Sequence, residues 1–251
     1  LPKQFESVDQ IESIILGKIE RQIQFDFPYT VAEPGSSITI ISTDTYCSMR
    51  SKKSSLVNPT LMWIEAVHKY APIDHGNLIS RVYQLQPYER PLLTPINIAI
   101  RYKNKYNDQE RMHLYYYDQR EGWTFIPSTN NKDRGVISGE VKQLDAIAII
   151  EDKSPPLILS SHPGNNGKYP SLELDQIKIR IDDKLSGFDP KESSFDIFLD
   201  SLPLIYTYQP KLKIISFDLS RPLSIGKHTM QITIRDQAGY KTNKIIEFSV
   251  Y

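Results

Sequence analysis

The pair Glu65 and His68 has the spacing by which a helix presents a carboxylate and an imidazole to one metal ion. Helical di-metal sites need two such pairs and further carboxylates, all presented by helices. If residues 61–70 form a strand instead, the two side chains point to opposite faces. We therefore expect a structural role for both residues, and a solvated turn position for His75.

Four acidic residues crowd one stretch of the second half of the chain: Asp182, Asp183, Asp189 and Asp196. Oxygen-rich loops between sandwich strands can hold Ca²⁺, which takes 6 to 8 oxygen ligands. The alternative is a solvated loop. We favour this alternative because the EF-hand pattern is absent and because Lys184 and Lys191 interrupt the acids.

The sequence lacks three signatures of catalysis or nucleotide binding: the G-x-S-x-G elbow, the G-x-x-x-x-G-K-S/T loop and the H-E-x-x-H zinc motif. Residues 164–168 (Gly-Asn-Asn-Gly-Lys) are not followed by a helical pattern, so they indicate a flexible connection rather than a phosphate site. Serine, histidine and aspartate are all present, but spacing alone does not define a triad. We expect no enzyme activity and no cofactor, with calcium as the one candidate.

The composition excludes several classes of protein. Thirty basic and thirty acidic residues cancel, which predicts no nucleic-acid partner. The single cysteine, Cys47, excludes an intrachain disulfide, and no apolar run approaches the roughly 20 residues of a membrane span. The chain begins Leu-Pro-Lys-Gln, which indicates a processed or excised segment of a longer protein.

The elements that must position these residues are strands. Period-two alternation bounded by Pro, Gly, Asn or Asp dominates the chain, and a turn about every ten residues is typical of a sandwich or barrel. The predicted strands are 20–27, 37–42, 61–68, 78–85, 96–102, 112–118, 124–127, 136–141, 146–151, 157–160, 176–181, 195–199, 203–208, 213–218, 228–235 and 242–251. Residues 8–16 fit a short helix or an edge strand equally well.

A domain boundary is predicted at residues 151–156, where a strand pattern ends and two prolines remove backbone donors. Tandem proline stiffens a linker, so Pro155 and Pro156 are the expected interdomain hinge. The predicted division is an extension at 1–17, a first β domain at 18–152 and a second at 153–251.

The first domain resembles the ZU5-type β domain. Four segments support this: 23–28 (Ile-Gln-Phe-Asp-Phe-Pro), 83–87 (Tyr-Gln-Leu-Gln-Pro), 92–102 around Thr-Pro-Ile-Asn-Ile, and 122–127 (Gly-Trp-Thr-Phe-Ile-Pro). Some eukaryotic relatives cut themselves at a His-Phe-Ser-like step, which this sequence lacks, so autoproteolysis is not implied.

The second domain resembles bacterial Ig-like domains of secreted and cell-surface proteins. The matching segments are 153–158 with its proline pair, the Asp-Asp-Lys-Leu-Ser-Gly-Phe loop at 182–188, and the final hairpin at 226–240. The usual ending of that hairpin is Ala-Gly-Asn, and Tyr240 departs from it, while Gly239 still suits a turn with positive φ. The two resemblances imply an all-β chain of two tandem β-sandwiches, the second Ig-like or fibronectin III-like.

Aromatic residues gather on one predicted hairpin: Tyr115, Tyr116, Tyr117 and Trp123. They place rings on both faces of the hairpin, so an exposed interaction surface is one interpretation. Core packing is favoured, because the ZU5 resemblance puts Trp123 on an inward strand.

These observations predict a non-catalytic structural or adhesive module pair of a larger exported bacterial protein, placed in the periplasm, at the outer surface or outside the cell. Its expected partners are other domains of the same polypeptide and other proteins. Two alternatives stay open: accessory domains of a secreted cell-wall peptidase or glycan hydrolase, and a module that assembles through strand edges.

Overall fold

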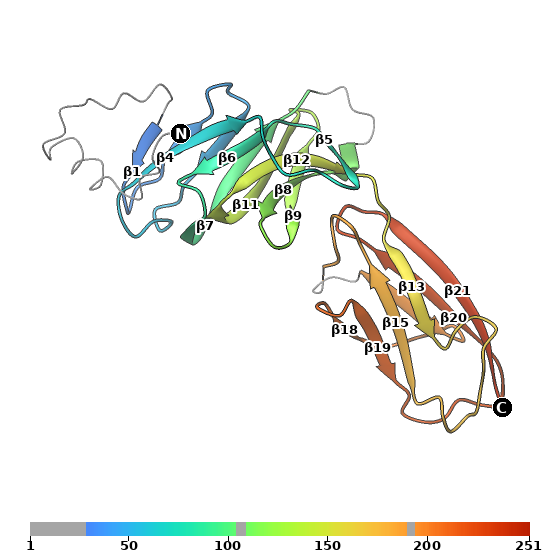
Figure 1. Cartoon of the computed structure of the whole chain (residues 1–251). Helices are drawn as coiled ribbons and strands as arrows, with labels where there is room; N and C mark the ends of the chain where they lie inside the picture. The colour runs from blue at the N-terminus through green and yellow to red at the C-terminus, as the bar shows by residue number, and fades with distance from the viewer. Residues whose placement is uncertain (1–28, 104–108, 190–193) are drawn as a thin grey trace, which may run out of the picture. The chain divides into compact units, whose positions relative to one another are not determined.

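The computed structural model describes residues 29–103, 109–189 and 194–251. The predicted segments 8–16 and 20–27, and Lys191, lie outside these ranges. The contacts divide the chain between Asp152 and Lys153 into two compact units. The described residues form strands and one 3₁₀ turn, Gln109–Arg111, without an α-helix, which confirms the all-β prediction (Figure 1). No helix among them is long and apolar enough to cross a membrane.

The first unit has two antiparallel sheets, here called sheet 1 and sheet 2. Sheet 1 has the order β1 (Tyr29–Ala32), β4 (Thr60–Val67), β6 (Val82–Gln86), β12 (Ala146–Asp152), β8 (Met112–Asp118) and β9 (Gly122–Ile126), with β5 (Gly76–Leu78) also paired to β12. Sheet 2 has the order β10 (Ser128–Asn131), β11 (Val136–Leu144), β7 (Arg90–Arg101), β3 (Cys47–Arg50) and β2 (Thr39–Ile41).

Alternating side chains of the two sheets meet in one core. Ile98 and Ile137 of sheet 2 and Leu114 and Ile149 of sheet 1 are fully buried in it. Such alternation sorts apolar side chains to one face of each sheet, so the first unit is a β-sandwich. The opposite face of sheet 1 is also covered, because β12 is buried along nearly its whole length.

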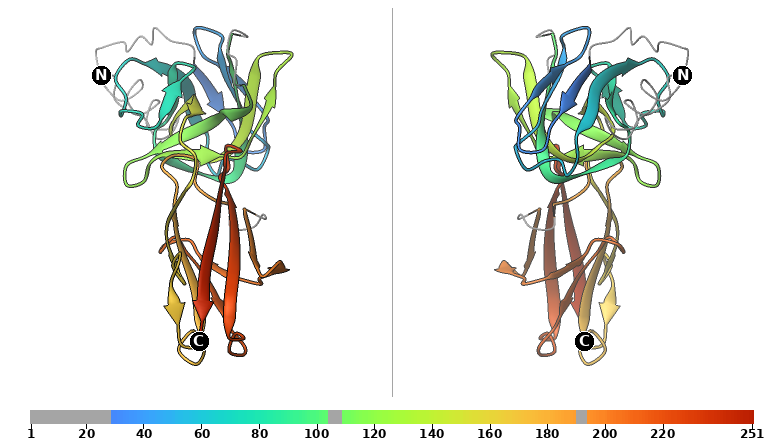
Figure 2. Two further views of the ribbon diagram at one scale, coloured as in Figure 1. Left: turned by 90° about the vertical axis from the view of Figure 1, so that its right-hand side faces the viewer. Right: turned by 90° about the vertical axis from the view of Figure 1, so that its left-hand side faces the viewer.

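The second unit is a second sandwich. Sheet 3 has the order β13 (Leu157–His162), β15 (Gln176–Asp182), β19 (Ile214–Asp218) and β18 (Thr207–Gln209). Sheet 4 has the order β14 (Lys168–Tyr169), β21 (Lys241–Val250), β20 (Gly226–Arg235), β16 (Phe195–Leu199) and β17 (Leu202–Pro203), and its β14–β21 pair is parallel. Figure 2 shows the two layers, with β13 in yellow and β20 and β21 in red.

Two predicted strands were wrong in their extent. Residues 78–85 span parts of two strands, because β5 ends at Leu78 and β6 begins at Val82. Both strands pair with β12. Residues 203–208 also divide, since β17 belongs to sheet 4 and β18 to sheet 3, so the chain crosses between the layers there. The sequence prediction also missed β1, β3, β10 and β14, which are short or carry few apolar residues.

Candidate functional site

Glu65 and His68 do not lie on a helix. Glu65 is an exposed residue of β4, and His68 follows the end of that strand and is exposed as well. His75 is exposed in a turn with a φ of 67°. The geometry therefore lacks the helical face on which a carboxylate and an imidazole would share one metal ion.

The four aspartates considered as calcium ligands make different contacts. Asp182 pairs with the ammonium groups of Lys184 and Lys213, each at 2.6 Å. Oδ1 of Asp183 accepts the amide N–H of Leu185 at 3.0 Å.

The remaining two of these aspartates, Asp189 and Asp196, also have different partners. Asp196 pairs with Arg235 at 2.5 Å, and the backbone carbonyl of Asp189 accepts the Ser194 hydroxyl at 3.1 Å. In the described parts of the chain, no three His, Cys, Asp or Glu side chains are grouped so that they could hold a metal ion.

The aromatic hairpin is mostly interior. Tyr115 is fully buried and its ring meets Phe125 edge-on at 5.7 Å, while Tyr116 is half-buried against the first core. Tyr117 is half-buried and contacts Trp123 at 5.6 Å. Trp123 is 8% exposed, so an interaction surface on this hairpin would depend on Tyr116 and Tyr117.

The two prolines of the predicted hinge differ in their surroundings. Pro155 is exposed, whereas Pro156 is buried and its carbonyl accepts the Thr242 hydroxyl at 2.6 Å. Both residues belong to the second unit, so Pro156 is held against the first residues of β21.

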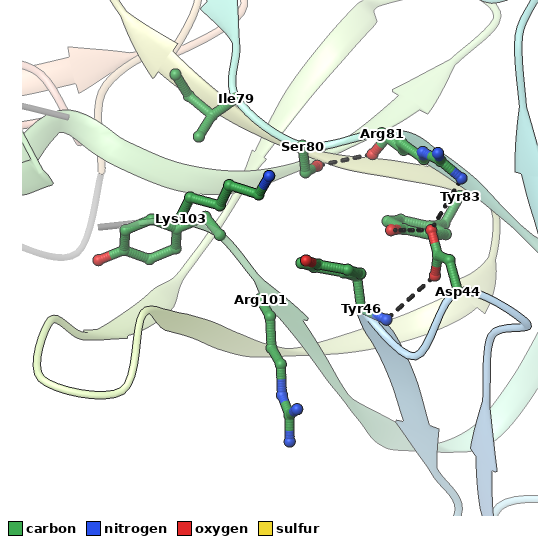
Figure 3. A pocket seen from close by; sticks show the side chains of 9 residues that line it. Asp44, Tyr46, Ile79, Ser80, Arg81, Tyr83, Arg101 and Lys103 are labelled. Atoms are coloured by element: carbon green, nitrogen blue, oxygen red, sulfur yellow. Dashed lines mark hydrogen bonds and ion pairs between the residues drawn. The ribbon is translucent and has the colours of Figure 1, made fainter. Parts of the chain in front are cut away.

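A hollow of about 300 Å³ in the first unit is lined mainly by polar and aromatic side chains (Figure 3). We call it the basic hollow. Its polar and aromatic lining includes Asp44, Tyr46, Ser80, Arg81, Tyr83 and Lys103. Asp44 and Tyr46 come from the β2–β3 turn, and Lys103 follows the end of β7. Ser80 and Arg81 lie in the link between β5 and β6, and Tyr83 lies in β6.

Asp44 organises this hollow. Its Oδ1 accepts the Ser42 hydroxyl at 2.6 Å and the Tyr46 amide at 3.1 Å, which closes the turn between β2 and β3. Its Oδ2 accepts the Tyr83 hydroxyl at 2.9 Å and a guanidinium N–H of Arg81 at 3.3 Å. Burial alone would raise the pKa of Asp44, but these bonds and the charge of Arg81 outweigh it and lower the pKa.

The cations of the hollow face different directions. Arg81 is held by Asp44, and the Lys103 side chain points its ammonium group toward the middle of the hollow, whereas Arg101 points away (Figure 3). Among the described residues, Lys103 forms no ion pair. The Tyr46 ring, 41% exposed, adds an aromatic wall.

The hollow can bind an anionic group. Its nine lining residues include no histidine or cysteine, and the Ser80 hydroxyl donates to the Arg81 carbonyl at 2.7 Å. Arg81 and Lys103 supply donors for a carboxylate.

Sequence reasoning missed the basic hollow. Its residues come from the β2–β3 turn, the β5–β6 link, the start of β6 and the end of β7, which no short motif connects. One local signal existed: Arg101 and Lys103 flank Tyr102 at the end of a predicted strand. The pairing of the Arg101 amide with the Tyr46 carbonyl at 2.8 Å brings the turn and this strand end together.

Comparisons with known proteins give fold-level likenesses only. No protein-family model matches the chain, and no curated protein matches it. CopC from Methylosinus trichosporium OB3b is similar with 16% identity and a TM-score of 0.31, over 38% of this chain and 92% of CopC.

Two further structures are similar over longer stretches. Latent PorU from Porphyromonas gingivalis matches with 11% identity and a TM-score of 0.31, over 66% of this chain and 23% of PorU. The extracellular domain of BT4673 from B. thetaiotaomicron matches with 12% identity and a TM-score of 0.29, over 87% of this chain and 31% of that one. These low TM-scores assign no function to the chain.

Proposed function

We propose that this chain is a non-catalytic interaction module pair of a larger exported bacterial protein, built from a ZU5-like and an Ig-like sandwich. Its first unit binds an anionic group of a partner, such as a glutamate or aspartate side chain, at the basic hollow. The second unit serves as a spacer, with Pro155 and Pro156 as the stiff joint.

The observation that carries this proposal is the ammonium group of Lys103. It points into a hollow beside Arg81 and Tyr46 and is not paired with an acid in the described residues. An Arg–Lys pair with an aromatic wall suits recognition of a carboxylate, because both cations donate charge-assisted hydrogen bonds.

Isothermal titration of the whole chain with N-acetyl-tetraglutamate amide tests the proposal. We expect binding at low salt that is lost in about 0.5 M NaCl, since screening at that ionic strength acts over a few ångströms. Lys103→Gln should weaken binding about fivefold, the effect of one partly exposed ion pair. Lys178→Gln, a change of an exposed lysine in β15, is the matched control. Equal affinity of the two variants would contradict the proposal.

A second candidate function is assembly through a strand edge. The outer edge of β21 is paired with β14 at Ser249 and Val250 and bonded to Asn165 and Asn166 at Glu247. Ile245 on the same strand is 61% exposed. Such an edge can accept a strand from another chain. A mass in solution that rises with concentration, and returns to the monomer in Ile245→Lys, would favour this function.

The accessory-domain alternative depends on the rest of the polypeptide. A peptidase or glycan hydrolase domain beside this segment would make the module pair its binding or spacing part. The sequence of the whole parent protein distinguishes this alternative from a purely adhesive protein.

A further inference from the structure

Two further hollows lie in the first unit, and they share no lining residue with the basic hollow. They have volumes of about 310 and 260 Å³ and share Asp118, Gln143 and Asp145 in their walls. We call the pair the Asp145 hollow. Tyr116 lines the larger part, and Tyr88 and Tyr117 line the smaller one.

Asp145 is a buried carboxylate without a cation beside it. Its residue is 8% exposed, and Oδ1 accepts one hydrogen bond, from the Gln143 side-chain amide at 3.0 Å. Within the described residues, no lysine, arginine or histidine forms an ion pair with it. A buried carboxylate is costly unless it is paired, so this position calls for a positive partner.

The charges that act on Asp145 itself are of the same sign as its own. Burial first, and then the charges of Glu89 and Asp118, raise the pKa of Asp145, while the bond from Gln143 opposes them. Glu89 is itself held by Gln119 at 2.7 Å, and Asp118 Oδ1 accepts the Arg120 amide at 2.7 Å. Neutral donors thus hold all three carboxylates, and the charge of the exposed Arg120 acts on Asp118.

The other charged groups of the wall do not neutralise Asp145. Glu140 is paired with Lys52 at 2.6 Å. Lys142 and Arg120 are exposed residues of the rim, and neither forms an ion pair in the described parts of the chain.

The aromatic walls determine which cation fits. Burial raises the pKa of the Tyr88 and Tyr116 phenols, and the charge of Asp145 raises both further. Aromatic faces attract organic cations, whereas a metal ion requires several converging oxygens. The described residues contain no group of three acids or imidazoles that could hold a metal ion.

We propose that the Asp145 hollow is a binding site for an alkylammonium group, with Asp145 as the counter-ion and Tyr88, Tyr116 and Tyr117 as the aromatic walls. The group belongs to a lysine side chain of a protein partner or to a free amine. The bound ammonium takes the position of the missing cation beside Asp145.

NMR titration of the whole chain with two ammonium probes tests the site: N-acetyl-lysine methylamide and 1,5-diaminopentane. We expect shifts of the Tyr116, Asp118 and Gln143 amides, and a fall of the Asp145 pKa when the probe binds. Asp145→Asn keeps the shape and an oxygen for Gln143, and it should weaken binding at least about tenfold, which corresponds to about 1.4 kcal/mol. Asp133→Asn, at an exposed turn position, is the matched control.

N-acetyl-norleucine methylamide, which has an alkyl chain without the ammonium, should not bind. Tighter binding of the lysine derivative assigns the site to a protein side chain, and tighter binding of the diamine assigns it to a free amine. Three results would overturn the proposal: binding of the norleucine compound with similar affinity, unchanged binding by Asp145→Asn, or shifts with calcium chloride but with neither amine.

Discussion

The imidazole of His228, in β20, lies between two hydrogen-bond acceptors. Nδ1 is 2.6 Å from Oδ2 of Asp200, Nε2 is 2.8 Å from the carbonyl oxygen of Ser224, and the ring is stacked on Phe248 at 5.4 Å. Neither a carbonyl nor an ionised carboxylate can donate, so the geometry fits the imidazolium form, in which both ring nitrogens donate. Burial alone would lower the pKa of His228, but the bonds to Asp200 and Ser224 and the charge of Asp200 raise it.

We predict that Asp200→Asn destabilises the second unit more at acidic than at alkaline pH. Asn tolerates the left-handed φ of 50° at this position, and its oxygen can keep the bond from the Thr229 amide. The change then removes the charge and places an NH2 group, which cannot accept, opposite Nδ1 of His228. Because folding raises the pKa of His228, the stabilisation is complete below the unfolded pKa of about 6.5 and disappears as pH rises through the folded pKa.

The magnitude follows from the hydrogen bond that is weakened. A bond between charged groups contributes about 1.5–3 kcal/mol, but the Asp200 side chain is 44% exposed and solvent screens its charge. We therefore expect a loss of about 1–2 kcal/mol at about pH 5.5, and a clearly smaller loss at about pH 8.5.

The assay must report on the second unit alone. Both tryptophans, Trp63 and Trp123, belong to the first unit, so amide hydrogen exchange of the buried Met230 in the whole chain is the suitable measurement. Asp175→Asn removes an exposed carboxylate of the same unit and is the control. Equal destabilisation by Asp200→Asn at both pH values, or a larger one at alkaline pH, would refute the imidazolium assignment.

Three further predictions concern the first unit. Trp123→Ala should cost about 3–5 kcal/mol in thermal unfolding, because the ring is 8% exposed and its Nε1–H donates to the Ala71 carbonyl at 3.3 Å; an unaltered melting temperature would instead assign the ring to recognition. Gly139→Ala should lower the free energy of unfolding in urea by about 1–3 kcal/mol, since its Cβ would lie 2.9 Å from the Pro127 carbonyl oxygen; an unchanged free energy would show that β11 can shift. Cys47 should not react with Ellman's reagent until the unit unfolds, because burial raises the pKa of its thiol and the residue is fully buried; rapid labelling in buffer would disprove this.

The regular strands of the fold could be predicted from alternation. Ile177, Ile179 and Ile181 alternate with polar residues in the predicted strand 176–181, and all three are buried in β15. The strands that were missed are those without this signal, such as β10, whose residues Ser128–Asn131 are all polar. Such strands form because a neighbouring strand offers a complete set of backbone partners, a long-range effect that local sequence does not contain.

The candidate sites could not be predicted from spacing. The basic hollow depends on an Asp44 carboxylate that binds Tyr83, a residue 39 positions further along the chain. The sequence gives no signal for a site at Asp145, because single acidic residues next to strands are common. Its significance comes from burial and from the like charges of Glu89 and Asp118, which only the folded arrangement brings near.

Chemical-shift mapping of the whole chain with the acidic tetrapeptide tests most directly whether the first unit works by binding. The account predicts that perturbed amides cluster at residues 44–46, 79–83 and 101–103 around the Lys103 side chain. Shifts confined to β21, or no shift at millimolar peptide at low salt, would contradict it.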